Sequence, residues 1–399
     1  MGFEHRRANG DQSESGGNAV REFTATLQTI MSVVSDQLEL IPATEGAIEE
    51  MTFVGEEERD DTKLCEENLL VETVLEVPKP IWKYRTVKPI YRAEDHFFRY
   101  FMDGSYRHYF LATGLEHDRA TPIFLAQIAI VVLQRNSDGR LSIVPEFKYH
   151  EWHLLLAKSR ISDIAWNRIL EATQQAGFNI TMQDISETDE LTGSLQDGHD
   201  LRQRGQTKTR YIMGIREIEI AQHFRESNPG AWLIKDGVIS IGAGRRGIQT
   251  TKIIGVAKNF TSVQKFFTQD GKTRKNESVV SLLGNLPVDH RTPVYEGYGG
   301  KTGFWYVRLR TSLQMLYPLY GVLKVEIPVI ESQPLTTDLV DEISGALIGE
   351  RFVTPYGSDD RWHSHLYPIY QAEHASKQCF YSTEVIQGCI NNALRSHRP

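Results

Sequence analysis

The chain has 399 residues, of which 40% are hydrophobic and 24% are charged. These proportions argue against a fibrous or wholly disordered chain, and the length suits one large domain or two modest ones. The longest apolar run, residues 122–133, contains Gln127 and falls well short of the roughly 20 residues that a membrane-spanning helix needs. The N-terminus lacks the apolar segment of a secretory signal, and the three cysteines show no metal-ligand spacing. We therefore expect a cytoplasmic protein with free thiols and no membrane span.

The charge is unevenly distributed along the chain. The net charge is −8, yet residues 45–72 hold eleven Asp/Glu against two Lys/Arg, a local −9. Residues 200–275 hold fifteen Lys/Arg against six Asp/Glu, a local +9. Because binding to phosphate backbones depends on local cationic surface, the overall negative charge does not exclude a nucleic-acid partner.

The first 75 residues differ in character from the rest. Residues 1–19 are rich in Gly, Ser and charged side chains, and we expect them to be flexible. Apolar residues at spacings of three and four predict an amphipathic helix over residues 20–40, which either covers the core or contacts a dimer or partner subunit. The acidic segment 45–72 reads as a linker or an exposed insertion. We therefore divide the chain into an N-terminal extension, residues 1–75, and a main domain, residues 76–399.

The main domain alternates between strand and helix patterns. Strands are predicted at 97–102, 106–112, 123–133, 231–235, 253–257, 304–309 and 322–327, with a turn at Asp103-Gly104-Ser105 between the first two. Helices are predicted at 162–176, 210–226, 262–267, 336–350, 366–378 and 383–395, and residues 181–208 form a polar excursion. The pattern predicts an α/β fold with a mixed sheet flanked by helices.

Two apolar segments end in the same dipeptide, FRYFMDG at Asp103 and AWLIKDG at Asp236. A carboxylate just past the end of a buried strand lies on a rigid element at the rim of the sheet, where two such groups can converge on a divalent cation. Mg²⁺ and Mn²⁺ favour oxygen ligands, and a pair of ions can hold both the attacking and the leaving oxygen of a phosphodiester. A single Asp-Gly is a common turn, and the hypothesis depends on its occurring twice.

Further candidates lie on predicted helices and after a strand. Glu217 and Glu219 precede Asp236 on one helix, and since they lie about 200° apart, only one of them can face inward. His374 lies on a predicted C-terminal helix, on the same face as Tyr367, and could bind an ion or protonate a leaving group. Lys258 follows its strand and could contact a phosphate.

Other site types find little support in the sequence. There is no GxxxxGK[ST] motif, and hence no reason to expect ATP hydrolysis in this chain. The glycine-rich segment 242–247 lacks the strand and helix setting of a dinucleotide site, and no GxSxG, HExxH or catalytic cysteine signature occurs.

The order of these motifs resembles the NurA nuclease family. The matching features are Asp103-Gly104-Ser105, a helical glutamate some seventeen residues before Asp236-Gly237, and the segment GVAK ending at Lys258. They continue with the segments WYVRLR and GVLKVEIP and a Tyr-Pro…Ala-x-His helix at 367–374, so that the resemblance runs over roughly residues 90–380.

The resemblance implies an RNase H-like core in which acidic residues bind two Mn²⁺ or Mg²⁺ ions. It implies a DNase with 5′→3′ exonuclease and single-strand endonuclease activity. It also implies a homodimer that works with a HerA-type hexameric ATPase in DNA end processing or phage defence. By position, the family's metal ligands correspond to Asp103, Glu219 (with Glu217 in reserve), Asp236 and His374. Its further site residues correspond to Tyr367 and Lys258. The segments 45–72 and 181–208 depart from a minimal member.

Two alternatives to a DNA nuclease remain open. The acidic segment and the amphipathic N-terminal helix also suit a catalytically silent adaptor of an ATPase ring. An RNase H-like site could instead cleave RNA or an RNA–DNA hybrid, because fold does not fix substrate. In the leading hypothesis the basic region 200–275 holds the DNA backbone, with Phe260, Phe266 and Phe267 as candidate stacking residues that also fit the core.

Overall fold

The computed structural model describes residues 15–43, 70–91, 98–186, 201–241, 246–258, 264–297, 300–310, 319–351 and 364–394. Most of the acidic segment (residues 45–69), the middle of the polar excursion (residues 187–200) and Phe260 lie outside the described residues. None of the described helices combines the length and apolar character that crossing a membrane requires.

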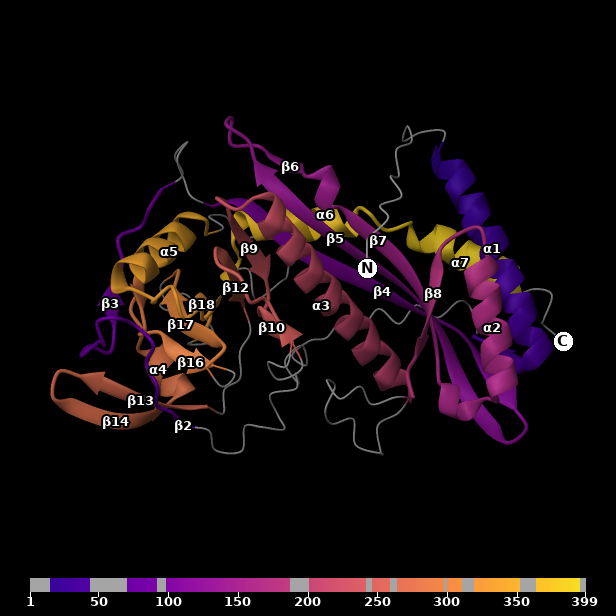
Figure 1. Ribbon diagram of the computed structural model, residues 1–399, viewed down its shortest axis with the longest axis horizontal. Helices are drawn as coiled ribbons and strands as arrows, with labels where there is room; N and C mark the ends of the chain where they lie inside the picture. Colours follow the sequence, from indigo (N-terminus) through magenta and orange to yellow (C-terminus); the bar gives the residue numbers. More distant parts are fainter. Residues whose placement is uncertain are drawn as a thin grey trace.

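The described part of the chain is a mixed α/β fold built on one large sheet (Figure 1). Its strands are β1 (Glu39–Pro42), β3 (Arg85–Thr86), β4 (Phe98–Glu116), β5 (Arg119–Arg135), β6 (Leu141–Ile143), β7 (Tyr149–Leu156), β8 (Ile180–Asp184), β9 (Trp232–Asp236), β12 (Ile253–Ala257), β15 (His290–Arg291), β16 (Tyr295–Gly297), β17 (Thr302–Arg308) and β18 (Val322–Pro328). Two small sheets accompany it: β10 (Ser240–Ile241) with β11 (Arg246–Gly247), and β2 (Leu70–Val71) with the hairpin β13 (Lys265–Asp270) and β14 (Thr273–Ser278).

Helices cover both faces of the large sheet. They are α1 (Ser15–Gln37), α2 (Asp163–Gln175), α3 (Leu201–Ser227), α4 (Val279–Gly284), α5 (Thr337–Gly349), α6 (Tyr367–Lys377) and α7 (Thr383–Leu394), with short 3-10 turns at Pro145–Phe147 and Lys158–Arg160. The long helix α3 crosses one face, while α5, α6, α7 and α1 pack on the other (Figure 1). The ends of three helices follow the expected local signals, because Ser162, Ser278 and Thr336 cap α2, α4 and α5.

The central strands run in the order β18-β12-β9-β4-β5-β7, in which β12, β9 and β4 are parallel to one another. Strands β5 and β18 run antiparallel to their neighbours. The predicted strands at 231–235 and 253–257, the strand pair at 304–309 and 322–327, and the three C-terminal helices are confirmed. So is the helix predicted at 162–176.

Three local predictions were wrong. The segment Asp103-Gly104-Ser105 is not a turn, because β4 continues without a break through the two predicted strands, 97–102 and 106–112. Its partner β5 has 17 residues against the 19 of β4, and every residue from Tyr100 to Phe110 has a cross-strand neighbour, so the antiparallel pairing outweighs the local turn signal. The helix predicted at 262–267 was also wrong, since β13 begins at Lys265, and α3 begins at Leu201 inside the expected polar excursion.

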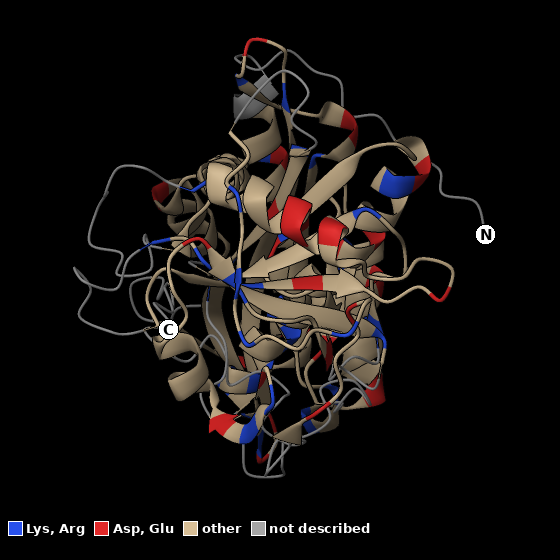
Figure 2. Ribbon diagram, turned by 90° about the vertical axis from the view of Figure 1, so that its left-hand side faces the viewer, with Lys and Arg blue, Asp and Glu red and all other residues tan. Residues whose placement is uncertain are grey.

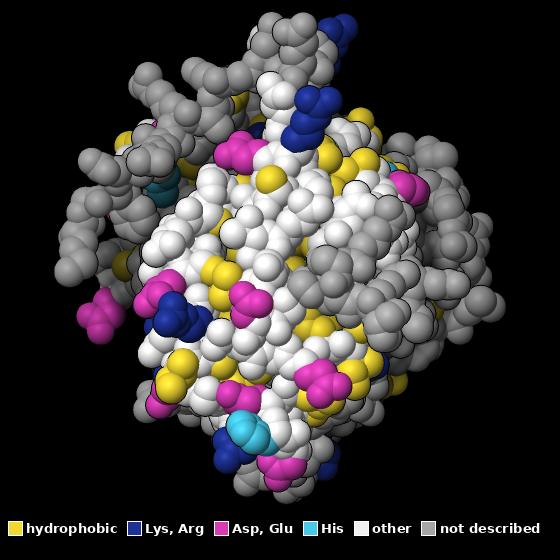
Figure 3. Space-filling view, turned by 90° about the vertical axis from the view of Figure 1, so that its right-hand side faces the viewer, with side chains coloured by type: hydrophobic (Ala, Val, Ile, Leu, Met, Phe, Trp, Pro, Cys, Tyr) yellow, Lys and Arg dark blue, Asp and Glu magenta, His cyan; other side chains and the backbone are white. Residues whose placement is uncertain are grey.

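The N-terminal helix packs on the main core. Phe23 of α1 is fully buried and its ring centroid lies 4.4 Å from that of Trp152 on β7. Strand β1 then pairs with the end of β4, with Glu39 opposite Leu115. The described part of the expected N-terminal extension therefore shares one core with the sheet. From the end that carries α1, α2 and α7, Figure 3 shows charged side chains scattered over the surface.

Because α1 shares the core, shortening Phe23 should destabilise the whole fold. Replacing a buried aromatic side chain with alanine costs about 3–5 kcal/mol. We expect Phe23→Ala to lower the free energy of unfolding by that amount in chemical denaturation, with a single transition. The control is Ile164→Ala on α2, which removes a side chain that is 73% exposed and should change the free energy by less than about 0.5 kcal/mol. An unchanged midpoint for Phe23→Ala would show that α1 is not part of the core.

Candidate active site

The parallel pairing of β4 with β9 brings Asp103 and Asp236 together. Phe101 pairs with Ile234 and Met102 with Lys235, so the next residues in register are the two aspartates. Neighbouring strands lie about 4.8 Å apart, and residues at matching positions share one face of the sheet. Strand β9 ends at Asp236, and Gly237 turns the chain away with a φ of 75°. The Asp-Gly turn is thus correct for Asp236, whereas Asp103 reaches the site from inside a long strand.

Asp103 is a buried carboxylate without a hydrogen bond to any described residue. Its exposed fraction is 5%. Burial, with repulsion from Asp236 next in importance, raises the pKa of Asp103 well above its ordinary value, although Lys258 opposes the shift. One oxygen of Asp236, Oδ1, is likewise buried and has no hydrogen-bond partner among the described residues. The site therefore holds carboxylate oxygens with free lone pairs, which is unusual in a folded interior.

Lys258 balances these two carboxylates. Val256 on β12 pairs with Asp236, so Lys258, two residues further on, extends from the same face of the sheet. Its Nζ lies 3.0 Å from Asp236 Oδ2. Burial would lower the pKa of Lys258, but the attraction of Asp236, Glu373 and Asp103 outweighs it and raises that pKa. The structure thus brings Lys258 to the carboxylates, and the phosphate contact expected of it stays a prediction.

A third carboxylate on this face comes from α6, and it is Glu373 rather than His374. Burial would raise the pKa of Glu373, but Lys258, Lys377 and His365 outweigh burial and lower it. His374 is exposed, with its ring centroid 4.3 Å from that of Tyr370, and Tyr367 is 37% exposed at the start of the helix. The expectation that His374 and Tyr367 lie at the carboxylates was therefore wrong.

The sequence analysis missed Glu373 although its spacing gives a signal. The buried side of α6 is marked by Ile369, Ala372 and Ser376, and Glu373 follows Ile369 by four residues and precedes Ser376 by three. A hydrogen bond of 2.7 Å between Ser105 on β4 and Ser376 ties this side of the helix to the sheet. His365 is also buried near Glu373, and no spacing pattern pointed to it.

From the other face of the sheet, α3 contributes Glu217. The side chain of Glu217 is 7% exposed, and its Oε2 lies 2.6 Å from Nζ of Lys235, which extends from β9. The Gly104 N–H donates a hydrogen bond to Glu217, and burial raises the pKa of this glutamate although Lys235 opposes the shift. A Cβ at position 104 would lie 2.6 Å from Glu217 Oε1, so any residue larger than glycine would force Glu217 to move.

The choice of Glu219 over Glu217 was wrong. Glu219 lies on the outer side of α3, with 46% of its side chain exposed, and accepts a hydrogen bond of 2.7 Å from Arg216. The helix interior shows the reason: Thr209, Ile212, Glu217, Ala221 and Phe224 share the buried side. Polar residues occupy much of α3, so the apolar stripe that would have identified this side is weak.

We call one group of side chains the acidic cluster. It consists of the carboxylates Asp103, Asp236, Glu217 and Glu373 and the lysines Lys235 and Lys258. Within the described ranges, no three His, Cys, Asp or Glu side chains stand close enough to enclose a metal ion as they are arranged. The carboxylates of Asp103 and Asp236 nevertheless fit a divalent cation, since both lie on rigid strands and Asp236 Oδ1 has no hydrogen-bond partner among the described residues, although Asp236 Oδ2 pairs with Lys258. Lysine ammonium groups supply the positive charge in the present arrangement.

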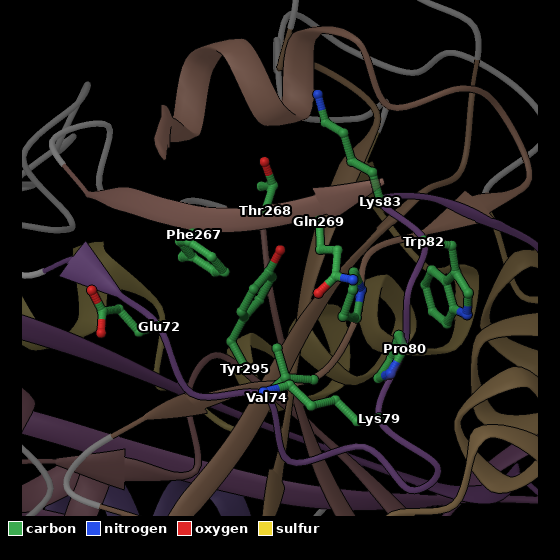
Figure 4. Close-up of a pocket in the computed structure, with 11 residues that line it drawn as sticks. Glu72, Val74, Lys79, Pro80, Trp82, Lys83, Phe267, Thr268, Gln269 and Tyr295 are labelled. Atoms are coloured by element: carbon green, nitrogen blue, oxygen red, sulfur yellow. The ribbon is translucent and has the colours of Figure 1, made fainter. Parts of the chain in front are cut away.

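The basic region 200–275 is divided between two places. Arg202, Arg204, Lys208 and Arg210 lie on the first half of α3, on the helix that presents Glu217. Lys265, Lys272, Arg274 and Lys275 belong to the β13–β14 hairpin at the left-hand end of the molecule in Figure 1, the end from which Figure 2 shows both basic and acidic residues. The hairpin also forms a pocket with Trp82 and Tyr295, into which Phe267 extends (Figure 4). Phe266 is a core residue, and no member of the acidic cluster lines this pocket.

Comparison with known proteins adds no family to this description. A scan against models of protein families gives no match, and a search of curated proteins gives none either.

The raised pKa of Asp103 makes the stability of the metal-free protein depend on pH. The unfolded carboxyl ionises near pH 4, whereas the folded one stays protonated to a higher pH because of burial and Asp236. As pH rises through this window the folded state loses stability relative to the unfolded state. We expect Asp103→Asn to unfold at a higher temperature than the unmodified protein at pH 7 in EDTA, with a smaller difference at pH 4. The control is Asp138→Asn, an exposed residue paired with Arg140. The quantity compared is the unfolding temperature of Asp103→Asn minus that of the unmodified protein. A smaller difference at pH 7 than at pH 4 would contradict the assignment.

The two glutamates of α3 should differ sharply in their effect on stability. Removing one partner of a buried ion pair costs about 3–5 kcal/mol, because it leaves the other charge buried and uncompensated. Glu217→Ala strands Lys235 in this way, whereas Glu219→Ala removes an exposed carboxylate and should cost less than about 1 kcal/mol. Urea unfolding of both variants measures the difference, and equal free energies of unfolding would contradict the burial of Glu217.

Proposed function

We propose that the protein is a divalent-metal-dependent phosphodiester hydrolase that cleaves DNA, with an RNase H-like core of the NurA type. The single observation that carries the proposal is the pair Asp103 and Asp236. A buried Asp103 lies beside the half-buried Asp236 on the adjacent parallel strand, and burial together with repulsion from Asp236 raises the pKa of Asp103. Paired carboxylates with strongly shifted pKa values are concentrated at catalytic and ion-binding sites.

The roles of the residues follow from their positions in the cluster. Asp103 and Asp236 would hold Mn²⁺ or Mg²⁺ through their free oxygens, with Glu373 as the third carboxylate on that face of the sheet. A bound divalent ion supplies an acidified water and neutralises charge on the phosphate. Lys258 would bind a non-bridging phosphate oxygen while keeping Asp236 in place. Glu217 would complete a two-ion site from the opposite face.

Several features suit a DNA substrate and the partners that the resemblance implies. Basic side chains lie on the first half of α3, the helix that carries Glu217, and would attract a phosphate backbone to this part of the molecule. We propose a homodimer in the cytoplasm, with DNA delivered by a HerA-type hexameric ATPase in end processing or phage defence. The motif order over residues 90–380 supports these assignments, and the acidic cluster is compatible with them.

A second candidate function is a catalytically silent adaptor of an ATPase ring. The observation that favours it is the engagement of Asp236 by Lys258 and of Glu217 by Lys235, which leaves two of the four carboxylates in ion pairs. An adaptor requires no ion at Asp103 and no hydrolysis.

Substitution of the first aspartate tests the proposal. We expect Asp103→Asn to lower the rate of Mn²⁺-dependent DNA degradation by at least about 100-fold, because it removes a carboxylate that would hold the ion. The matched control is Glu219→Gln on the exposed side of α3, which should retain full activity. Labelled single-stranded DNA, double-stranded DNA, RNA and hybrid are digested in parallel. Degradation of RNA or hybrid alone would change the substrate class, and an Asp103→Asn variant as active as the control would discard the site.

A further inference from the structure

The hairpin β13–β14 has two faces of different chemistry. Side chains alternate between the faces along each strand, and residues paired across the hairpin share a face. One face packs inward, where Phe266, Thr268 and Glu277 are each at most 6% exposed. The outer face carries exposed or half-buried side chains: Lys265, Phe267 and Gln269 on β13, and Arg274, Asn276 and Ser278 on β14. It therefore holds two cations, two amides and an aromatic ring, and none of these six side chains is a carboxylate.

Phe267 on this outer face differs from its neighbour Phe266. The ring of Phe266 packs against Tyr295, with centroids 4.8 Å apart, whereas no ring contact joins Phe267 to another aromatic side chain within the described ranges. Phe267 is half-buried and extends with Gln269 into the pocket beside the hairpin (Figure 4). Its ring thus remains open to stacking by a planar ligand.

The pocket continues onto the segment that precedes β3. Lys79, Pro80 and Trp82 line it from there, and Glu72 lines it next to β2 (Figure 4). The Trp82 ring is held by Arg291, whose guanidinium carbon lies 5.0 Å from the ring centroid. The pocket therefore combines one aromatic ring from the hairpin with another, held in place, from a distant segment of the chain.

Positive charge dominates the described residues around this pocket. In residues 72–83 and 265–278 the exposed cations are Lys79, Lys265, Lys272, Arg274 and Lys275, and the exposed anions are Glu72 and Asp270. The remaining charged side chains of these segments are in ion pairs, Lys83 with Glu277 and Glu76 with Arg291. Seven cations thus stand against four anions, which leaves +3. A surplus of this sign favours a phosphate backbone.

We propose that the outer face of the hairpin and its pocket bind single-stranded DNA, with a base stacked on Phe267 and the backbone held by Lys265 and Arg274. Single-strand sites combine aromatic rings with cations, because every base has a flat face and every nucleotide a phosphate. No member of the acidic cluster lines the pocket, so this contact is separate from the carboxylates. The inference rests on the proposed function for the choice of DNA, and it adds a contact outside the cleavage site.

The test is fluorescence anisotropy of a labelled strand of about 12 thymidines with the full chain in EDTA, where metal-dependent cleavage cannot occur. We expect Phe267→Ala to weaken binding at least about fivefold, because it removes the stacking of one base. Arg274→Gln should weaken binding and lower the slope of log affinity against log salt by about 0.7. The matched controls are Tyr91→Ala, a 76% exposed aromatic, and Arg119→Gln, an exposed cation. Neither lines the pocket, and both should bind like the unmodified protein.

A second pair of variants keeps the inference testable if Phe267→Ala does not fold. Phe267→Leu keeps an apolar side chain without the ring and should bind more weakly, whereas Phe267→Tyr keeps the ring and should bind normally. Undiminished binding by Phe267→Leu and Arg274→Gln, or no binding by the unmodified protein, would overturn the inference. So would tighter binding of an acidic peptide with the sequence of residues 45–69, which would assign the surface to a protein partner. Binding that depends on Phe267 and Arg274, in a protein that degrades no DNA with Mn²⁺, would uphold the inference and refute the proposed function.

Discussion

The structure depends on one electrostatic constraint, the placing of a buried aspartate, Asp103, beside the half-buried Asp236 on parallel strands. The register of β4 with β9 brings Asp103 and Asp236 together, and that register is fixed by the apolar residues that precede them on both strands. A shift of one residue would turn these apolar residues away from their core and separate the carboxylates. The fold therefore cannot relax the repulsion by sliding the strands, and it compensates with cations instead.

Lys258 supplies this compensation for the aspartates, while a second lysine, Lys235, pairs with Glu217 on the opposite face of the sheet. Lys258 reaches Asp236 from β12 on the face covered by α6, and Lys235 reaches Glu217 on the face covered by α3. Strand β9 ends at Asp236. On the neighbouring strand β4, one residue past Asp103, the Gly104 N–H donates a hydrogen bond to Glu217. An arrangement that costs stability in the metal-free protein is the expected signature of a site selected for binding rather than for folding.

How far the sequence predicts this site can be judged residue by residue. Asp236 was predicted for the correct reason, because an apolar strand ends there and a glycine with positive φ follows. Asp103 was predicted from a turn that the structure does not contain. The strand continues here because β4 pairs with β5. Gly104 instead leaves room for the close approach of Glu217. A single Asp-Gly cannot distinguish a turn from close backbone approach, since both require the absence of a side chain.

The helical residues show a different limit. On a helix, adjacent positions differ in direction by about 100° and positions two apart by about 200°, so choosing His374 over Glu373 or Glu219 over Glu217 turns the side chain out of the site. The buried spacing of Ile369, Ala372 and Ser376 would have identified Glu373. No equally clear stripe marks α3, whose buried side includes glycine, glutamine and threonine. Its direction is set by contacts with β4 and β5, which only the folded chain provides.

The central claim is that a cation binds between the two aspartates, and a crystal soaked in Mn²⁺ tests it most directly. The account predicts an anomalous scattering peak within about 2.0–2.4 Å of a carboxylate oxygen from each of Asp103 and Asp236. A well-ordered crystal with both carboxylates visible and no peak between them, or with the manganese elsewhere, would contradict it.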